Sequence, residues 1–494
     1  MNHLAYTLGL FAVGLTFAAL AWLNGGAGAA TAETASTAAE VTAAVLAIAV
    51  TVVAIVLELA ANRYTHRITQ HFVREPINAA TLGFFVVTTM ACLWVSASTE
   101  SMPGIGAWIA MMMATMSLAS LLPYFVFLFR FLGPSNTIAR IRGEATDAVR
   151  KSKGAKSARS AVVRAIRDLE DIGRRAQAQR DRSIAMSVVD ALGGMLEDYL
   201  PLRGQLSEEW FEMSDELSRD PDFVSLAPSS RREIEENGTW LETKILRTHL
   251  TLFEDALGNS RDLANLITLN TRRLGEKVFA GEAPISLLRL TTRFFNTYLR
   301  FSMRAGDVRT AYYAQHQYRL LAESALSAGD VDTAREIGNA LLEYSLFAYE
   351  IDEPFLLQVG AYELGELVAH AATSESPGVD DLLEVFLKFD RKSISLESVH
   401  EDTLIAVRHE QVSLAAFFLD RGDEVRARMI HADMVGENPE RLKTVHDRLV
   451  AATDEQYMEF SDRGVNFSWV SPERRAQLDR FFGWFDLPPN PTID

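Results

Sequence analysis

The sequence predicts an all-α protein in which a four-span transmembrane helical block precedes an irregular cytoplasmic α-solenoid. Four apolar stretches, each near the ~20 residues that a helix needs to cross a membrane, fall within the first 133 residues. Beyond them, apolar residues recur at the spacing of amphipathic helices. No run of alternating β-branched residues bounded by hairpin turns indicates a sheet.

The four apolar stretches cover residues 4–23, 41–61, 79–98 and 106–132. The first could instead be a signal peptide. Its start carries no lysine or arginine, and its apolar run exceeds the usual ~7–15 residues, so we expect a retained span. The last stretch is overlong, and Pro123 is expected to kink it. The alternative of a soluble core fails because no amphipathic helices nearby could cover four such segments.

Arginine and lysine lie on one side of this block. Residues 24–40 and 99–105 contain none, and 24–40, rich in Ala, Gly, Ser and Thr, is predicted to be a flexible connector. The hinge 62–78 contains three arginines, and a basic collar follows the fourth span. The collar comprises Arg140, Arg142, Arg150, Lys151, Lys153, Lys156 and Arg159. The positive-inside rule therefore places the hinge and the N- and C-termini in the cytoplasm, with the spans in the plasma (inner) membrane.

The net charge of −17 is distributed unevenly along the chain. Residues 130–182 carry +8, and residues 183–494 carry −23. The collar can attract anionic lipid headgroups, although any flank on the positive side of a membrane is basic. The acidic remainder excludes nucleic acid as an expected partner, because nothing there would neutralise phosphates. The only cysteine, Cys92, allows neither an intrachain disulfide nor a cysteine metal cluster.

The second and third spans and their hinge carry a recognisable pattern. The residues that form it are Asn62, Tyr64, Arg67, Phe72, Arg74, Glu75, Leu82, Gly83 and Phe85. This pattern resembles the span–hinge–span signature of the domain-of-unknown-function 2254 family of predicted membrane proteins. The resemblance covers about 45 residues and implies membrane topology alone, because the family has no assigned activity.

Three similar turns mark the cytoplasmic region. "AGDVRTA" (305–311), "AGDVDTA" (328–334) and "RGDEVRA" (421–427) each lie between amphipathic patterns. Their glycines, Gly306, Gly329 and Gly422, can adopt the left-handed conformation that ends a helix. Their aspartates, Asp307, Asp330 and Asp423, can cap the next helix. The surrounding spacing is similar to tetratricopeptide-type repeats but does not hold a ~34-residue period, which predicts an irregular stack of antiparallel helices.

These signals predict the helices and the domain organisation. We expect helices near 286–304, 308–327, 331–350, 355–373, 378–391, 397–420, 423–435 and 439–460. We divide the chain into a transmembrane domain, a basic juxtamembrane linker with a helical hairpin, a helical connecting region, a helical-repeat domain and a C-terminal tail. Their bounds are 1–133, 134–205, 206–285, 286–480 and 481–494.

Glu58 is the only ionisable residue well inside a predicted span, and such residues are functional candidates. It lies about one helical turn from the cytoplasmic interface. We therefore favour a snorkelling pair with Arg63 or Arg67 over an ion or proton pathway.

No catalytic, cofactor-binding or metal-binding constellation is expected. The sequence contains no phosphate-binding loop, dinucleotide fingerprint, H-E-x-x-H or nucleophile elbow. His400, His409 and His431 are scattered and are interpreted as helix-surface histidines.

The leading functional hypothesis is a membrane-anchored protein-interaction scaffold with lipids and either a protein partner or a second copy as its contacts. The alternative is a homo-oligomeric channel or transporter-like assembly, for which Glu58 and nearby threonines are the only features. An enzyme ranks third.

Overall fold

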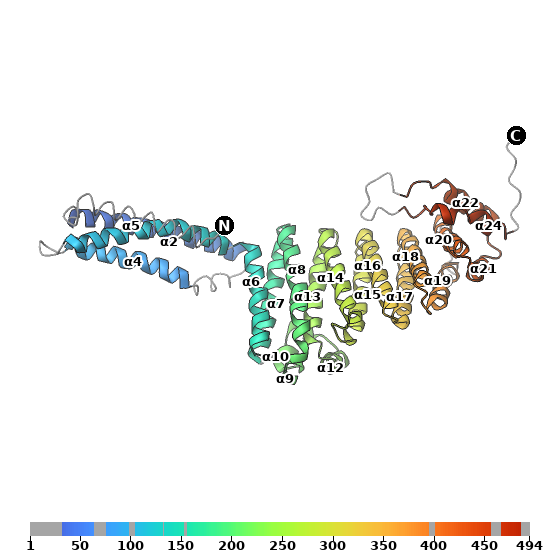
Figure 1. Cartoon of the computed structure of the whole chain (residues 1–494), viewed down its shortest axis with the longest axis horizontal. Coiled ribbons are helices and arrows are strands. Elements are labelled where there is room, and N and C mark those ends of the chain that lie inside the picture. Colours follow the sequence, from blue (N-terminus) through green and yellow to red (C-terminus); the bar gives the residue numbers. More distant parts are fainter. Residues whose placement is uncertain are drawn as a thin grey trace. The chain divides into compact units, whose positions relative to one another are not determined.

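The computed structural model describes residues 32–63, 76–97, 104–131, 133–152, 156–394, 401–455 and 466–485. Within these ranges every regular element is a helix, which confirms the predicted all-α class (Figure 1). The chain divides into two compact units. The first contains Met1–Ser152 and Ser157–Leu192, and the second contains Lys153–Lys156 and Gly193–Asp494.

Three helices of the first unit are long and apolar enough to cross a membrane. They are α2 (Ala32–Arg63), α4 (Pro76–Ala97) and α5 (Gly104–Phe131), and α5 contains Pro123. The predicted first span, 4–23, lies outside the described residues. The prediction of a flexible connector over 24–40 is wrong from Ala32 onward, because its alanine-rich second half is a good helix former and extends α2.

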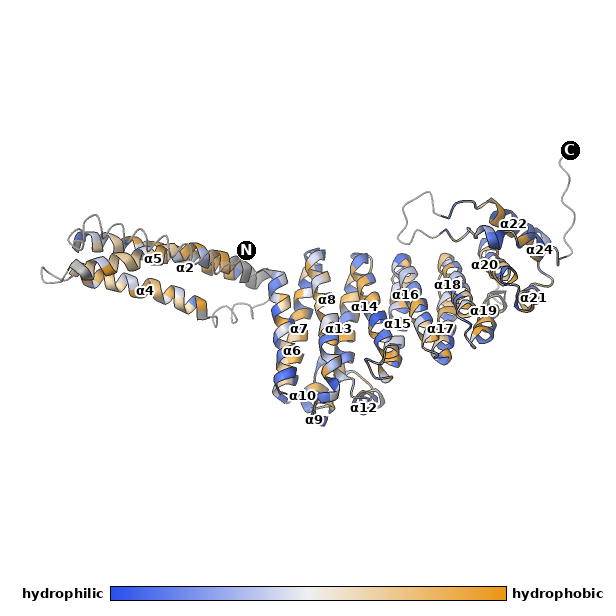
Figure 2. Ribbon diagram, viewed as in Figure 1, coloured by the Kyte–Doolittle hydropathy of each residue, from blue (hydrophilic) through white to orange (hydrophobic). Residues whose placement is uncertain are grey.

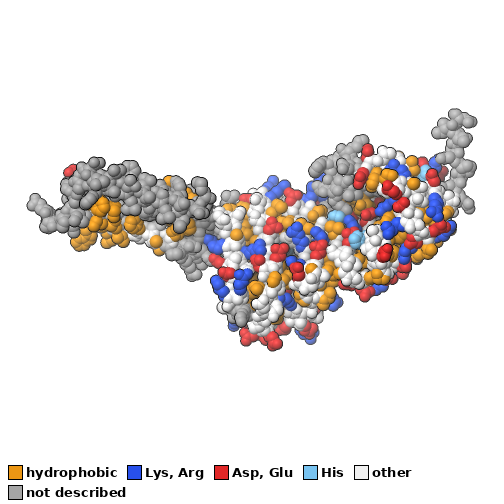
Figure 3. Space-filling view, viewed as in Figure 1, with side chains coloured by type: hydrophobic (Ala, Val, Ile, Leu, Met, Phe, Trp, Pro, Cys, Tyr) orange, Lys and Arg blue, Asp and Glu red, His pale blue; other side chains and the backbone are white. Residues whose placement is uncertain are grey.

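Hydrophobic side chains gather on the outside of these three helices. In Figure 2 apolar residues dominate α2, α4 and α5, and in Figure 3 the surface of this part that is not grey is mainly hydrophobic, whereas charged residues are interspersed over the helices of the second unit. Ile48, Leu93 and Trp94 are 64%, 56% and 73% exposed. Such an apolar exterior is unfavourable in water and matches a lipid environment.

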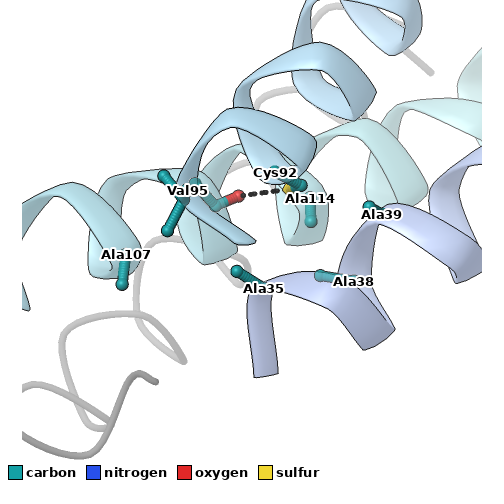
Figure 4. Packing of buried hydrophobic residues seen from close by; sticks show 8 residues of the cluster. Ala35, Ala38, Ala39, Cys92, Val95, Ala107 and Ala114 are labelled. Atoms are coloured by element: carbon teal, nitrogen blue, oxygen red, sulfur yellow. Dashed lines mark hydrogen bonds between the residues drawn. The ribbon is translucent and has the colours of Figure 1, made fainter. Parts of the chain in front are cut away.

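The inside of the three-helix bundle is lined by small residues (Figure 4). Its buried cluster consists of Ala35, Ala38, Ala39, Cys92, Val95, Ala107, Ala110 and Ala114. The Cys92 thiol donates to the carbonyl of Ala110 at 3.6 Å. Small side chains at an interface let helix backbones approach closely, which is how helices associate where lipid removes the hydrophobic driving force.

Amphipathic helices follow directly. They are α6 (Pro134–Ser152), α7 (Lys156–Ala178) and α8 (Arg182–Tyr199). Within the predicted juxtamembrane region, 134–205, α6 continues to Ser152 and α7 begins at Lys156. Short helices then occupy a stretch rich in proline and acidic residues. They are η2 (Leu200–Gln205), α9 (Glu208–Phe211), α10 (Asp215–Ser218), α11 (Pro221–Val224) and α12 (Pro228–Glu236).

The rest of the second unit is a stack of helices (Figure 1). It consists of α13 (Trp240–Ala256), α14 (Arg261–Phe279), α15 (Ser286–Arg304), α16 (Val308–Ser327), α17 (Val331–Glu350), α18 (Pro354–Thr373), α19 (Val379–Ile394), α20 (Glu401–Asp420), α21 (Glu424–Asp433), α22 (Pro439–Ala451), α23 (Pro472–Arg475) and α24 (Leu478–Phe482). The predicted bounds hold within a few residues, except that the last long helix ends at Ala451. In the second half of the predicted helical connecting region, 206–285, the chain forms two helices with a break after Ala256.

The stack has two layers. Helices α14, α16, α18 and α20 pack on one another in succession, and α15, α17 and α19 do the same in the other layer. Each helix thus contacts its neighbour in sequence and the next helix of its own layer. This is the packing of an α-solenoid, in which every element buries its apolar face against adjacent elements. The tetratricopeptide-like assignment itself stays a prediction.

Candidate protein-interaction face

The three repeated turns set the register of the stack. Gly306, Gly329 and Gly422 have φ of 66°, 82° and 77°, in the left-handed region that a side chain disfavours. The carboxylates of Asp307, Asp330 and Asp423 accept hydrogen bonds from the backbone amides of Thr310, Thr333 and Arg426. The glycine therefore ends one helix and the aspartate begins the next with no intervening loop.

Charged side chains line the layer formed by α14, α16, α18 and α20. Arg319 on α16 donates from Nε to Oε2 of Glu363 on α18 at 2.6 Å, and it also pairs with Glu323 one turn away. Glu363 is fully buried. Burial disfavours the charged guanidinium, but the two carboxylates outweigh this and raise the pKa of Arg319. The pair fixes α16 against α18.

A segment from the far end of the chain lies on this layer. Phe467 is 5% exposed, and its ring contacts three aromatic rings of α16 and α18. The centroid distances are 6.1 Å to Tyr312, 6.3 Å to Phe355 and 4.8 Å to Tyr362, all with edge-to-face geometry. Val470 is 2% exposed. The turn around Phe467 is thus held by an aromatic pocket through one aromatic anchor.

The same segment makes a charged contact seven residues later. Arg474 lies 3.7 Å from a carboxylate oxygen of Glu366 on α18. Its guanidinium also covers the ring of Phe417 on α20, 4.9 Å from the centroid. We name Tyr312, Phe355, Tyr362, Glu366 and Phe417 the docking face, and residues 466–475 the docked segment.

A buried acid–base pair lies on α20 close to this face. His409 and Glu410 are 4% and 6% exposed, and Nδ1 of His409 is 3.6 Å from Oε1 of Glu410. Burial raises the pKa of Glu410, and the neighbouring His409 opposes this. The interpretation of His409 as a surface histidine is wrong, because α20 is packed on several sides. His400 lies outside the described residues.

The aromatic tail that follows also docks. Phe481 and Phe482 are 0% and 5% exposed. His431 contacts the ring of Phe485 at 4.5 Å and the carbonyl oxygen of Trp484 at 3.1 Å. The docked segment was not predicted from the sequence, because "NFSWVSPERR" shows no helical period.

The residues proposed for an intramembrane polar site are not brought together in the described part of the chain. Glu58 is exposed near the end of α2. Arg63 is the last residue of α2, and its side chain lies outside the description, as does Arg67. A pairing with Glu58 stays a prediction.

The basic collar is only partly available to lipid. Arg150, Lys151 and Lys156 are exposed, and Lys153 lies outside the described residues. Arg140 and Arg142 are half-buried. Arg159 is only 6% exposed, so its assignment to the collar is wrong: it faces the packed side of amphipathic α7.

Helix α13 buries ionised groups that the sequence analysis did not single out. Lys244 and Asp220 are each 1% exposed, and Nζ of Lys244 lies 2.9 Å from Asp220 and 2.7 Å from Asp222. Asp220 and Asp222 precede Lys244 by 24 and 22 residues in the sequence. The periodicity of a helix or strand does not indicate contacts at such separations.

A second ion pair in the same region joins Arg203 of η2 to Glu242 of α13. Glu242 is fully buried and accepts from Nη1 of Arg203 at 2.6 Å. Burial raises its pKa to about 7, although Arg203 opposes the shift. Among the described residues, no group of histidine, cysteine, aspartate and glutamate is arranged to hold a metal ion.

A protein-family model matches the first part of the chain. Residues 4–196 match the model of DUF2254, a family described as predicted membrane protein. The resemblance inferred from the hinge residues is therefore confirmed, and the match extends on both sides of them through α7 and most of α8. No curated protein and no solved structure matches the chain. Together with the three apolar helices, the match shows a membrane protein.

Proposed function

We propose that the protein is a membrane-anchored scaffold that binds a segment of a protein partner on the docking face. In this proposal α2, α4 and α5 cross the plasma (inner) membrane with a further span before them. The N-terminus and the C-terminal body lie in the cytoplasm, and the exposed collar residues contact lipid headgroups. The proposal assigns no catalytic residue, cofactor or nucleic acid.

One observation carries the proposal: the docking face already holds a peptide segment. Phe467 fills an aromatic pocket, and Arg474 adds an ion pair and a contact over an aromatic ring. Aromatic and arginine side chains in desolvated pockets dominate peptide and protein recognition. A partner segment with an aromatic residue and an arginine seven positions later matches the same chemistry.

The docked segment acts as an internal competitor in this proposal. A tethered segment has an effective concentration in the millimolar range when its linker is short and flexible, so a partner binds only when it outcompetes that segment. Weakening the docked segment should therefore strengthen binding of the same sequence supplied in trans.

A peptide titration tests this. The full chain is placed in nanodiscs, and a fluorescent peptide with the sequence of residues 466–475 is titrated into the wild type and into Phe467→Ala. We expect binding to Phe467→Ala at least about tenfold tighter than to the wild type, since a buried aromatic anchor contributes more than 1 kcal/mol. A peptide whose own phenylalanine is replaced by alanine should bind neither protein.

Matched variants distinguish binding at the docking face from binding elsewhere on the protein. Tyr362→Ala removes the closest ring of the pocket and should abolish peptide binding in the Phe467→Ala background. Ile285→Ala, at a position 71% exposed, should leave it unchanged. Failure of the peptide to bind Phe467→Ala while hydrogen exchange of α18 stays slow would contradict the proposal.

A further inference from the structure

A pocket of about 330 Å³ lies among α12, α13 and α15, away from the docking face. This volume is within the range of about 300–1,000 Å³ that small-molecule sites occupy. Its apolar side chains are Leu226, Ile234, Leu250, Leu290 and Phe294, and polar or charged side chains complete the lining. The apolar lining can take up a ring or a short hydrocarbon chain.

One polar group in the pocket wall is buried with its hydroxyl unused. Thr243 on α13 is 4% exposed, and its Oγ1 has no hydrogen-bond partner among the described residues. Thr248 on α13 also has a buried hydroxyl without a partner among the described residues, but it does not line the pocket. Thr297, which lines the pocket as Thr243 does, donates to the carbonyl of Arg293 at 2.9 Å. A buried hydroxyl without a partner is unfavourable, so a ligand that accepts a hydrogen bond from Thr243 removes this cost.

The charged lining of the pocket is positive. It consists of Arg247, Arg293 and Glu233, with a net charge of +1, inside a region of the chain that is strongly acidic. Glu233 is already paired, because its carboxylate lies 2.9 Å from Arg293 and 3.9 Å from Arg289. The pocket therefore has no free carboxylate to repel an anion.

The guanidinium of Arg247 makes one ion pair in the described structure and has further N–H donors for a ligand. Its Nε lies 3.5 Å from Asp222, but that carboxylate also accepts from Lys244 at 2.7 Å. A guanidinium carries five N–H donors in a planar fork that suits a carboxylate. Arg247 and Thr243 are four residues apart on α13, so they lie on the same face of the helix.

The helix that presents these two groups is held rigidly. On either side of Thr243, Glu242 is tied to Arg203 and Lys244 is tied to Asp220 and Asp222. Groups whose supporting residues are locked by buried hydrogen bonds keep the geometry that binding requires.

From these contacts we infer that the pocket binds a compact amphipathic carboxylate, with an apolar ring or short chain against Leu250, Leu290 and Phe294 and its carboxylate on Arg247 and Thr243. This site is independent of the docking face. It assigns a ligand class to the first helices of the stack and to α12, which precedes them.

The test uses 2-naphthoate as the probe, with the full chain in nanodiscs and empty nanodiscs as the background for partition into lipid. Equilibrium dialysis gives the Kd, and saturation-transfer NMR reports direct contact. We expect saturable binding of naphthoate, with the neutral 2-naphthalenemethanol at least about tenfold weaker because it lacks the charge that Arg247 binds.

Variants locate the site. Leu290→Trp fills the pocket and should abolish binding, whereas Ile285→Trp adds the same side chain at an exposed position of the same region and should not change the Kd. Arg247→Gln should weaken naphthoate about tenfold while leaving the alcohol unchanged. Thr243→Val, of nearly the same shape, should weaken it several-fold.

Three results would overturn the inference. They are an absence of naphthoate binding at millimolar concentration, equal affinity for the alcohol, and binding that survives Leu290→Trp. Hydrogen exchange of α13 and α15 in each variant shows whether the fold is retained. If Leu290→Trp unfolds the region, Arg247→Gln and Thr243→Val decide the question, because neither changes the apolar packing.

Discussion

The three membrane helices and the helices of the second unit, here called the body, bury side chains of different size. In the membrane bundle the buried seam consists of small residues such as Ala35, Ala39 and Cys92, and large apolar residues such as Trp94 face outward. In the body the largest side chains are inside, with Trp210 among those fully buried. The difference follows from the solvent: water drives large apolar groups inward, and lipid does not.

Polar groups differ in the same way. In the described membrane helices, buried hydroxyls bond mainly to their own helix, as Thr42 does to the carbonyl of Ala38 at 2.7 Å. In the body, buried charges pair across long stretches of chain, as Lys244 does with Asp220. Polar contacts therefore contribute little to how the membrane helices associate and much to how the body is held together.

The largest expected effect is the loss of a buried charge in the body. Lys244→Met removes the cation beside the buried Asp220 and leaves Asp222 with Arg247 alone, and the loss of one partner of a buried pair typically costs about 3–5 kcal/mol. Hydrogen–deuterium exchange of peptides covering α13 measures this, and protection should fall by about a hundredfold or more.

An exposed ion pair serves as the control for that variant. Arg335 and Asp332 on α17 are 3.2 Å apart, with side chains 47% and 90% exposed. Arg335→Met should cost less than about 1 kcal/mol, because solvent already screens the pair. Equal losses of stability in Lys244→Met and Arg335→Met would show that the buried ion pair is worth no more than the exposed one.

The local part of this organisation could be predicted from the sequence. The bounds of α15, α16 and α17 follow from Gly306 and Gly329, since a glycine that ends a helix and an aspartate that caps the next are adjacent in the chain. The membrane helices follow from length and hydropathy for the same reason. Each of these signals is contained within one turn or one helix.

The candidate sites could not be predicted in this way. Phe467 meets Tyr312 and Tyr362 only because the stack brings residues more than a hundred positions apart together. Burial of His409 and Arg159 likewise depends on which helix covers which face. Sequence periodicity identifies a helix and its apolar stripe, but it does not identify the partner of a polar residue on that stripe.

The second-largest expected effect is a dependence of the unfolding free energy on pH, which arises from Glu242 in the body. Native Glu242 keeps its proton up to a pKa of about 7, whereas an unfolded glutamic acid loses it near 4.5. Between these values the native state binds more protons, so stability falls as pH rises and is constant above about pH 7. The total change is about 3 kcal/mol at most.

Glu242→Gln isolates this contribution. The amide does not titrate, so the difference in unfolding free energy between the variant and the wild type should change between pH 5 and pH 8, in favour of the variant at the higher pH. Urea unfolding of the full chain at four pH values gives the difference, and other titrating groups cancel in it. A difference that is independent of pH would mean that Arg203 keeps Glu242 ionised throughout.

The smallest expected effect is in the membrane bundle, where Thr89 on α4 donates to Thr42 on α2 at 3.3 Å. Each hydroxyl also bonds to its own helix, Thr89 to the carbonyl of Phe85 at 2.9 Å.

Because those local bonds survive when the partner is removed, the coupling energy between the two threonines should be only about 0.6 kcal/mol, a typical value for such pairs. A double-mutant cycle of Thr42→Val and Thr89→Val measures it, with unfolding in dodecyl sulfate followed by the separation of fluorophores at the ends of α2 and α4. A coupling above about 2 kcal/mol would show that interhelical polar contacts, rather than the alanine seam, hold the membrane helices together.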